Sequence, residues 1–81
     1  MKQIIYFYAG WCDTCQRMTP IIDQIQRSKK TQVAKIDTDY DASNVSTYNV
    51  QSVPTTIILE NGKEIKRHVG YISHRDLLND L

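Results

Sequence analysis

The segment from Gln3 to Ala9 constrains the fold more than any other part of this chain. Its sequence, QIIYFYA, is apolar at consecutive positions and rich in β-branched and aromatic residues. A strand that is solvated on one face alternates apolar and polar residues, whereas a strand covered on both faces is apolar throughout. The segment is therefore predicted to be the interior strand of a sheet that has helices on both sides.

An amphipathic helix is predicted to follow, over residues 12 to 28. Apolar residues from Met18 to Ile25 recur at helical spacing, and polar side chains occupy the opposite side. Pro20 lies inside this segment and removes one backbone hydrogen bond, so we expect a kink there. Gln32 to Asp37 then has the pattern of a second strand. Two strands joined through a helix form a right-handed parallel βαβ unit.

A short helix and an antiparallel hairpin are predicted next. Asp41 can cap the short helix. The Asn61-Gly62 pair lies between Thr55–Leu59 and Lys63–Val69, and this dipeptide favours a two-residue hairpin turn. The last two strands are therefore expected to be antiparallel, with the final, charged strand at an edge of the sheet.

A capping box is predicted to open the last helix, because Ser73 is followed three residues later by Asp76. Leu77, Leu78 and Leu81 are expected to point inward from this helix. The complete order is β-α-β-α-β-β-α. It predicts a single α/β domain over residues 1–81, with a four-stranded mixed sheet and helices on both faces.

Charge and hydropathy limit the classes of partner. Ten Lys and Arg residues against nine Asp and Glu residues give a net charge of +1, and these charges are scattered, so we expect no nucleic-acid partner. No run approaches the roughly 18 apolar residues of a membrane span, and Met1 leads directly into the first strand without a signal peptide. We therefore expect a cytoplasmic monomer that contacts other proteins and no membrane.

The chain's two cysteines, Cys12 and Cys15, lie three residues apart where the first strand meets the first helix. In a reducing cytosol such a pair is more often catalytic or metal-binding than a permanent disulfide. The first helical turn has free N–H groups and the positive end of the helix dipole, which stabilise a thiolate. Residues i and i+3 share a helix face, so the two sulfurs can meet. We predict that an exposed Cys12 attacks a substrate disulfide and that the more shielded Cys15 resolves the mixed disulfide.

Several motifs together resemble the thioredoxin family. They are the apolar first strand, WCDTC with Pro20 five residues after the second cysteine, and the segments VAKID, VPT, NGK and VGY. The resemblance covers nearly the whole chain, but the N-terminal strand and helix of full-length thioredoxins are missing, as in small, glutaredoxin-sized thioredoxins. It implies a thioredoxin-like βαβαββα fold in which the first strand lies between the second and the third, and the fourth lies beside the third.

The resemblance implies a thiol-disulfide oxidoreductase that reduces protein disulfides and carries electrons. Such a protein cycles between a dithiol and a redox-active Cys12–Cys15 disulfide and binds no other cofactor. The implied partners are disulfide-containing target proteins and, as electron donor, a thioredoxin-reductase-like flavoenzyme.

A substrate surface around the first cysteine is also implied. Pro54 corresponds to the family's cis-proline, and Val53 before it would offer its backbone N–H and C=O to an extended substrate segment. Trp11, Gly70 and Tyr71 would complete a shallow apolar surface. The glycine would let a partner backbone approach closely.

Four residues are expected to tune the site. Asp13 and Thr14 stand where the family commonly has Gly-Pro. Asp13 places a like charge beside the nucleophile, whereas Thr14 can donate a hydrogen bond to sulfur, which leaves the reduction potential open. Tyr6 stands where thioredoxins usually bury an aspartate, and a phenol, with an ordinary pKa of about 10, is a poor base at neutral pH. Lys35, which partners that aspartate in relatives, is retained without its usual carboxylate.

Three alternatives accompany this prediction. The cysteines could bind zinc with His68 and His74, but the gap between the two pairs is far longer than in zinc fingers, so we expect no metal and two solvated histidines. A glutathione-dependent glutaredoxin usually has Gly-Gly followed by Asp near its last helix, where this chain has VGYI. A non-catalytic binding module with the thioredoxin fold would need neither cysteine.

Overall fold

Strands and helices alternate along the chain as the sequence predicts. The computed structural model describes all residues, 1–81. Its elements are β1 (Lys2–Tyr8), α1 (Asp13–Ser28), β2 (Gln32–Asp37), α2 (Ala42–Thr47), β3 (Thr55–Glu60), β4 (Lys63–Val69) and α3 (His74–Asn79). The predicted bounds of the strands and of the first helix therefore agree with the structure to within about one residue. None of the helices has the length and apolar character that crossing a membrane requires.

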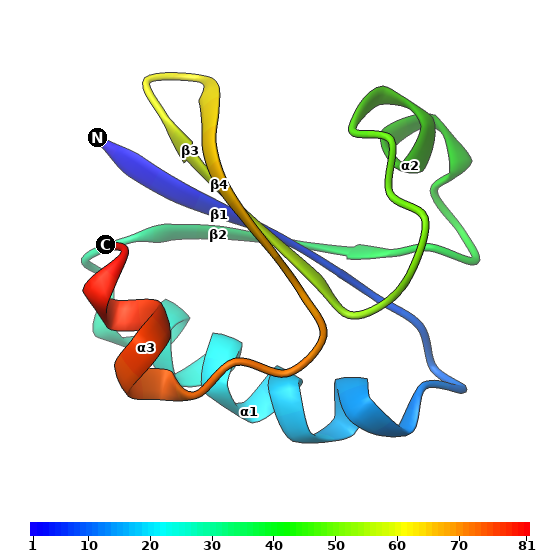
Figure 1. Cartoon of the computed structure of the whole chain (residues 1–81), viewed down its shortest axis with the longest axis horizontal. Coiled ribbons are helices and arrows are strands. Elements are labelled where there is room, and N and C mark those ends of the chain that lie inside the picture. The colour runs from blue at the N-terminus through cyan, green and yellow to red at the C-terminus, as the bar shows by residue number, and fades with distance from the viewer.

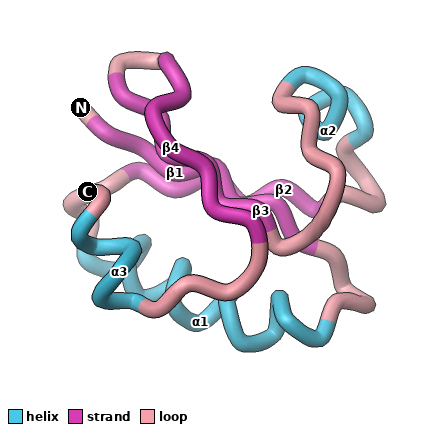
Figure 2. Tube along the Cα trace, viewed as in Figure 1, coloured by secondary structure: helices cyan, strands magenta, loops and turns pink.

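The four strands form one mixed sheet in the order β2-β1-β3-β4. Strand β1 pairs in parallel with β2 and antiparallel with β3, and β3 pairs antiparallel with β4. The apolar first strand is interior, as predicted, and the charged β4 is at an edge. Helices α1 and α3 cover one face of the sheet, and α2 covers part of the other (Figure 1; Figure 2). The fold is therefore the predicted thioredoxin-like βαβαββα arrangement.

Each face of the sheet has its own core. Under α1 and α3 the buried residues are Ile4, Tyr6, Met18, Ile22, Ile25, Ile58 and Leu77. Under α2 they are Phe7, Val50, Ile57 and Leu59. The prediction that Leu78 points inward is wrong, because this side chain is 47% exposed. Consecutive residues of a helix point about 100° apart, so in the six-residue α3 the inward position of Leu77 turns Leu78 to solvent.

Local side-chain and backbone geometry sets the ends of the elements. The Asp41 carboxylate accepts the backbone N–H of Asn44 at 3.1 Å, and the Ser73 hydroxyl accepts that of Asp76 at 3.1 Å. Both are the predicted helix caps. Asn61 and Gly62 have positive φ angles of 52° and 86°, which a tight hairpin turn between β3 and β4 requires.

Candidate active site

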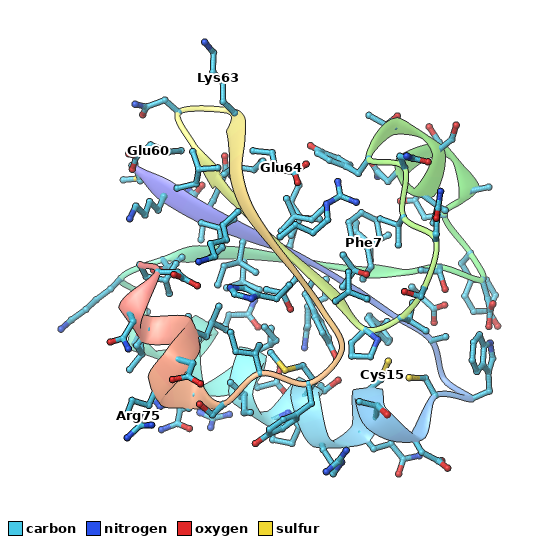
Figure 3. The ribbon with its side chains drawn as sticks, in the orientation of Figure 1. Phe7, Cys15, Glu60, Lys63, Glu64 and Arg75 are labelled. Atoms are coloured by element: carbon cyan, nitrogen blue, oxygen red, sulfur yellow. The ribbon has the colours of Figure 1, made fainter.

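Cys12 and Cys15 lie at the start of α1 and pack against Ala9, which follows β1; Figure 3 shows Cys15 in the first turn of this helix. Cys12 is the N-cap residue, with extended backbone angles of φ −94° and ψ 112°. Its sulfur accepts a hydrogen bond from the backbone N–H of Cys15 at 3.1 Å, the position that a capping oxygen usually fills. Both cysteines are free thiols. The Cys12 sulfur therefore faces the unpaired N–H groups of the helix, as the sequence predicts.

Burial distinguishes the two thiols less than expected. Cys12 is 7% exposed and Cys15 is 2% exposed, and both pack with Ala9 in a small cluster. The prediction of an exposed Cys12 is therefore wrong in degree, although Cys15 is the deeper residue. The cause is the loop before β3, because the Cys12 thiol donates to the carbonyl oxygen of Val53 at 3.7 Å.

The surroundings of Cys15 favour its protonated form. Burial, and after it a hydrogen bond with Cys12, raises the pKa of the Cys15 thiol to about 11. The hydroxyl of Tyr6 lowers the pKa of the same thiol by hydrogen bonding. Cys15 is therefore a thiol at neutral pH and must lose its proton before it can act as a nucleophile.

The loop that contains Pro54 faces the cysteines. The Val53–Pro54 peptide bond is cis, and the carbonyl oxygen of Pro54 accepts the backbone N–H of Gly70 at 2.8 Å. Gly70 has a φ of 94°, and a Cβ atom built on it meets no atom within 4 Å. This hydrogen bond holds the loops at the ends of β3 and β4 together, and the space in front of Gly70 is open to another chain.

Exposed aromatic rings flank the cysteines. Trp11 is 69% exposed and Tyr71 is 49% exposed. The Trp11 indole N–H donates to Asp39 at 3.4 Å, and the Arg17 guanidinium lies 5.1 Å from the centre of the Tyr71 ring. Sequence reasoning missed both partners. Parallel pairing of β1 and β2 brings their carboxyl ends together, so it could have placed Asp39 near Trp11.

A cavity of about 150 Å³ lies beside Trp11, bounded by Val53 of the Pro54 loop and by Val45 of α2. It is large enough for one small side chain. Of the predicted substrate-binding residues, Trp11 and Val53 line this cavity, Pro54 is fully buried, and Gly70 and Tyr71 lie on the loop after β4.

Tyr6 lies entirely inside the protein, where its hydroxyl has two partners. It is within 2.9 Å of the Thr19 hydroxyl and donates to the carbonyl oxygen of Cys15 at 3.3 Å. Burial raises the pKa of the Tyr6 phenol to about 12. Tyr6 is therefore protonated at neutral pH and cannot act there as a base.

The other three predicted tuning residues differ in their contacts. Asp13 is exposed as the first residue of α1, whereas Thr14 forms no side-chain hydrogen bond, so the expected bond from Thr14 to sulfur is absent. Lys35 does have a carboxylate partner, since its ammonium lies 2.7 Å from Asp23 on α1. This carboxylate is not the usual one, whose place Tyr6 takes, but a replacement that the helix supplies.

The two histidines lie away from the cysteines. His68 is half-buried and pairs with Asp80 at 2.5 Å, so the expectation that it is solvated is wrong. His74 is half-buried at the start of α3. No three His, Cys, Asp or Glu side chains are grouped so that they could hold a metal ion.

A capping cysteine, a deeper partner thiol and a proline loop opposite them form a site suited to thiol–disulfide exchange. Residues 1–81 match the family model described as Thioredoxin. The chain belongs to the thioredoxin family. It is 36% identical over 80 residues to "Thioredoxin Y, chloroplastic" of Oryza sativa subsp. japonica, an alignment that covers 96% of this chain and 48% of the relative.

Two further thioredoxins show the range of chain lengths among the relatives. A "Bifunctional thioredoxin reductase/thioredoxin" of Mycobacterium leprae is 34% identical over 80 residues, which are 96% of this chain and 18% of the relative. The solved structure of a mutant thioredoxin from Halobacterium salinarum NRC-1 superposes with a TM-score of 0.89 at 31% sequence identity. The superposition covers 96% of this chain and 69% of the Halobacterium chain. The chain spans about half the length of the rice relative. Thioredoxins are protein-disulfide oxidoreductases, and Cys12 and Cys15 have the CxxC spacing of that chemistry.

Proposed function

We propose that this chain reduces protein disulfides by dithiol exchange. The Cys12 thiolate attacks one sulfur of a target disulfide, and the other target sulfur leaves and takes a proton. Cys15 then loses its proton and attacks the Cys12 sulfur, which forms the Cys12–Cys15 disulfide and releases the second target thiol. Two electrons pass from the chain to the target. The observation that carries the proposal is the Cys12 sulfur as helix cap, 3.1 Å from the Cys15 N–H.

The target is proposed to bind as an extended segment across the Pro54 loop. The backbone of Val53 lies beside the Cys12 sulfur, and pairing with a target backbone is a general mode of peptide recognition. Trp11 and Tyr71 would contact target side chains through their exposed rings. Gly70 leaves space for the target backbone.

A flavoenzyme of the thioredoxin-reductase class is the proposed electron donor. A protein that carries thioredoxin reductase and thioredoxin in one chain, from Mycobacterium leprae, supports this pairing. The proposal places the chain in the cytoplasm, because a reducing compartment keeps both thiols free between turnovers. It also proposes that the chain acts as a monomer. It assigns no bound cofactor other than the cysteine pair.

A single-turnover experiment with insulin as the target tests the proposal. Reduced wild-type protein is mixed with insulin without any other reductant, and the products are separated under non-reducing conditions and weighed. Wild type is expected to yield reduced insulin chains and its own disulfide. Cys12→Ser is expected to yield neither, and Cys15→Ser is expected to accumulate as a covalent adduct with an insulin chain.

Repeated turnover by Cys15→Ser without added thiol would contradict the scheme. A parallel assay with a glutathione mixed disulfide of hydroxyethanethiol distinguishes the glutaredoxin alternative. Glutathione-dependent turnover of that small substrate, with no reaction on insulin, would replace the proposed substrate class.

A further inference from the structure

Thr19 connects the deeper cysteine to the buried phenol of Tyr6. It lies four residues after Cys15 on α1, which places the two side chains on the same side of the helix. The Thr19 and Tyr6 hydroxyl oxygens are 2.9 Å apart, and the Tyr6 hydroxyl lies 3.3 Å from the Cys15 carbonyl oxygen. A hydroxyl pair therefore lies directly against the residue that must lose a proton.

The hydrogen bond between the Thr19 and Tyr6 hydroxyls can run in either direction, because each hydroxyl carries one proton. Each hydroxyl donates one hydrogen bond and accepts others. If Thr19 donates to the Tyr6 oxygen, the Tyr6 proton is directed toward Cys15. It bonds the Cys15 carbonyl oxygen in the resting protein, on the same residue whose sulfur must become an anion. A donor to an ionised sulfur stabilises that ion, and Tyr6 already lowers the pKa of the Cys15 thiol.

A surface cavity provides access for solvent. It has a volume of about 330 Å³, and Cys15 and Thr19 both line it, together with Tyr8 of β1 and Gln16 of α1. Water in this cavity is within the same small space as the thiol and the Thr19 hydroxyl. It can accept the proton that neither Tyr6 nor Thr19 is able to accept at neutral pH.

We propose that Thr19 is a positioning residue for the resolving step of the proposed function. Its hydroxyl donates to Tyr6, Tyr6 donates to the Cys15 sulfur as that sulfur loses its proton, and cavity water accepts the proton. The Cys15 thiolate then attacks the Cys12 sulfur, and the target thiolate leaves. No carboxylate is needed at the position of Tyr6, because the two hydroxyls stabilise the anion and water removes the proton.

The titratable and charged side chains around the Tyr6–Thr19 hydroxyl pair have other interaction partners. Those that face it are Cys12 at the start of α1, Tyr8 on β1, Lys35 on β2 with Asp23 on α1, His68 on β4 with Asp80 after α3, and Arg17 over Tyr71. Lys35 therefore pairs with Asp23, His68 hydrogen-bonds Asp80, and Arg17 lies over the Tyr71 ring. The groups whose hydrogen bonds reach the Cys15 thiol are Cys12, Tyr6 and the backbone of Ala9.

The two steps can be separated with a small aromatic disulfide. Reduced protein attacks dithiobis(nitrobenzoate) through Cys12 and releases one coloured thiolate at a rate proportional to reagent concentration. Cys15 then attacks the mixed disulfide and releases a second coloured thiolate at a rate independent of reagent concentration. Stopped-flow measurement of the second phase across pH reports the ionisation of Cys15 alone.

Thr19→Val replaces the hydroxyl with a methyl group of nearly the same shape. We expect it to slow the second phase about threefold to tenfold at neutral pH and to move its pH midpoint upward, because a hydrogen bond to a charged group is weakened. The first phase should not change. Thr19→Ser should restore the second phase, and Tyr6→Phe should slow it without a further loss in the Tyr6→Phe/Thr19→Val double variant.

Thr47→Val, which changes an exposed threonine on α2, is the matched control and should behave as wild type. A wild-type second phase in both Thr19→Val and Tyr6→Phe would overturn the inference, as would Thr19→Ser being as slow as Thr19→Val. A wild-type protein that lacks the concentration-independent phase altogether would instead overturn the dithiol function itself.

Discussion

The face of the sheet under α2 and the face under α1 and α3 differ in what they bury. Under α2 the core cluster is apolar and is built around Phe7, and the one buried hydroxyl there, that of Thr55, is bonded to the carbonyl of Ser52. Under α1 and α3 the buried set includes the hydroxyls of Tyr6 and Thr56. Phe7 projects toward α2, and Cys15 lies on the opposite side of the sheet (Figure 3). The chemistry of the chain is thus confined to one face, and the other face contributes stability.

The polar side chains of the chemical face lie in one row across the sheet. Lys35 pairs with Tyr6, Tyr6 pairs with Thr56, and Thr56 pairs with His68, one residue from each strand. Neighbours in such a register share a face. The outer members of the row have partners in Asp23 and Asp80. The difference between the faces teaches that polar side chains concentrate on the face under α1 and α3, where most of them are paired and the Thr56 hydroxyl is the unpaired exception.

Phe7→Ala should have the largest effect, on stability and not on chemistry. Removal of a fully buried aromatic ring costs about 3–5 kcal/mol, and urea denaturation should show this loss in the free energy of unfolding. The rate of the resolving phase, measured on folded protein, should stay at the wild-type value because Phe7 lies on the other face. A slower resolving phase in folded Phe7→Ala would end the separation of the two faces.

Thr55→Val should have the next largest effect. The Thr55 hydroxyl is buried on the α2 side and donates to the carbonyl oxygen of Ser52 at 2.7 Å. Its loss leaves that carbonyl without its partner, so we expect the free energy of unfolding to fall by about 1–2 kcal/mol. Urea midpoints at constant slope provide the measurement, and an unchanged midpoint would show that this hydrogen bond is dispensable.

Thr56→Val should act in the opposite direction. The Thr56 hydroxyl is fully buried and has no hydrogen-bond partner. Replacement by a methyl group of the same shape removes an unsatisfied polar atom, so we expect a gain of about 1 kcal/mol in the free energy of unfolding. The neighbouring Thr55→Val is the matched comparison. Destabilisation by both substitutions would mean that the Thr56 hydroxyl has a partner in solution.

Asp80→Asn should have the smallest effect, a loss of stability at neutral pH that disappears in acid. Pairing with His68 and Lys66 lowers the pKa of the Asp80 carboxyl. A carboxyl whose pKa is lower in the folded state contributes stability above its unfolded pKa of about 3.9 and loses it as the pH falls through the folded value. The variant should therefore show a flatter decline of the melting temperature below roughly pH 4.

Glu64 and Asp41, whose carboxyl pKa values are also lowered, should preserve part of the acid sensitivity in Asp80→Asn. The contact between β4 and the end of α2, in which Arg67 donates to the Tyr48 carbonyl at 2.7 Å, should not change in acid. Arginine stays protonated at every pH used in such a titration. An acid profile of Asp80→Asn identical to that of wild type would remove the His68–Asp80 contact from the stability of the chemical face.

Most of the fold could be predicted because its determinants are local. The apolar run of β1, the Asn61-Gly62 turn and the caps at Asp41 and Ser73 each act within a few residues. They fix the order and the ends of the elements. A parallel βαβ unit and a hairpin then leave few arrangements of four strands.

The contacts and exposures that the sequence did not predict depend on how distant segments pack together. Lys35 meets Asp23, and His68 meets Asp80, only after a strand is packed under a helix. The exposure of Leu78 follows from the rotation of a short helix about its axis, which the positions of Leu77, Leu78 and Leu81 alone do not define. Burial of Cys12 follows from the position of the Pro54 loop.

The candidate site was predictable in its cysteines but not in its hydroxyl network. Spacing and the helix start indicate Cys12 and Cys15, and the family resemblance draws attention to Tyr6. Nothing in the sequence indicates that Thr19 faces Tyr6, because that contact depends on the depth at which α1 packs on β1. The same depth determines how much solvent reaches Cys15.

The sulfur that caps α1 makes the first helical turn sensitive to the ionisation of Cys12. As a thiol, Cys12 accepts the Cys15 amide and donates to the Val53 carbonyl. An ionised sulfur is a stronger acceptor than a neutral one. Formation of the Cys12 thiolate should therefore tighten the first turn of α1 and release the carbonyl of the Pro54 loop, so that the reactive form of the site also has the more firmly capped helix.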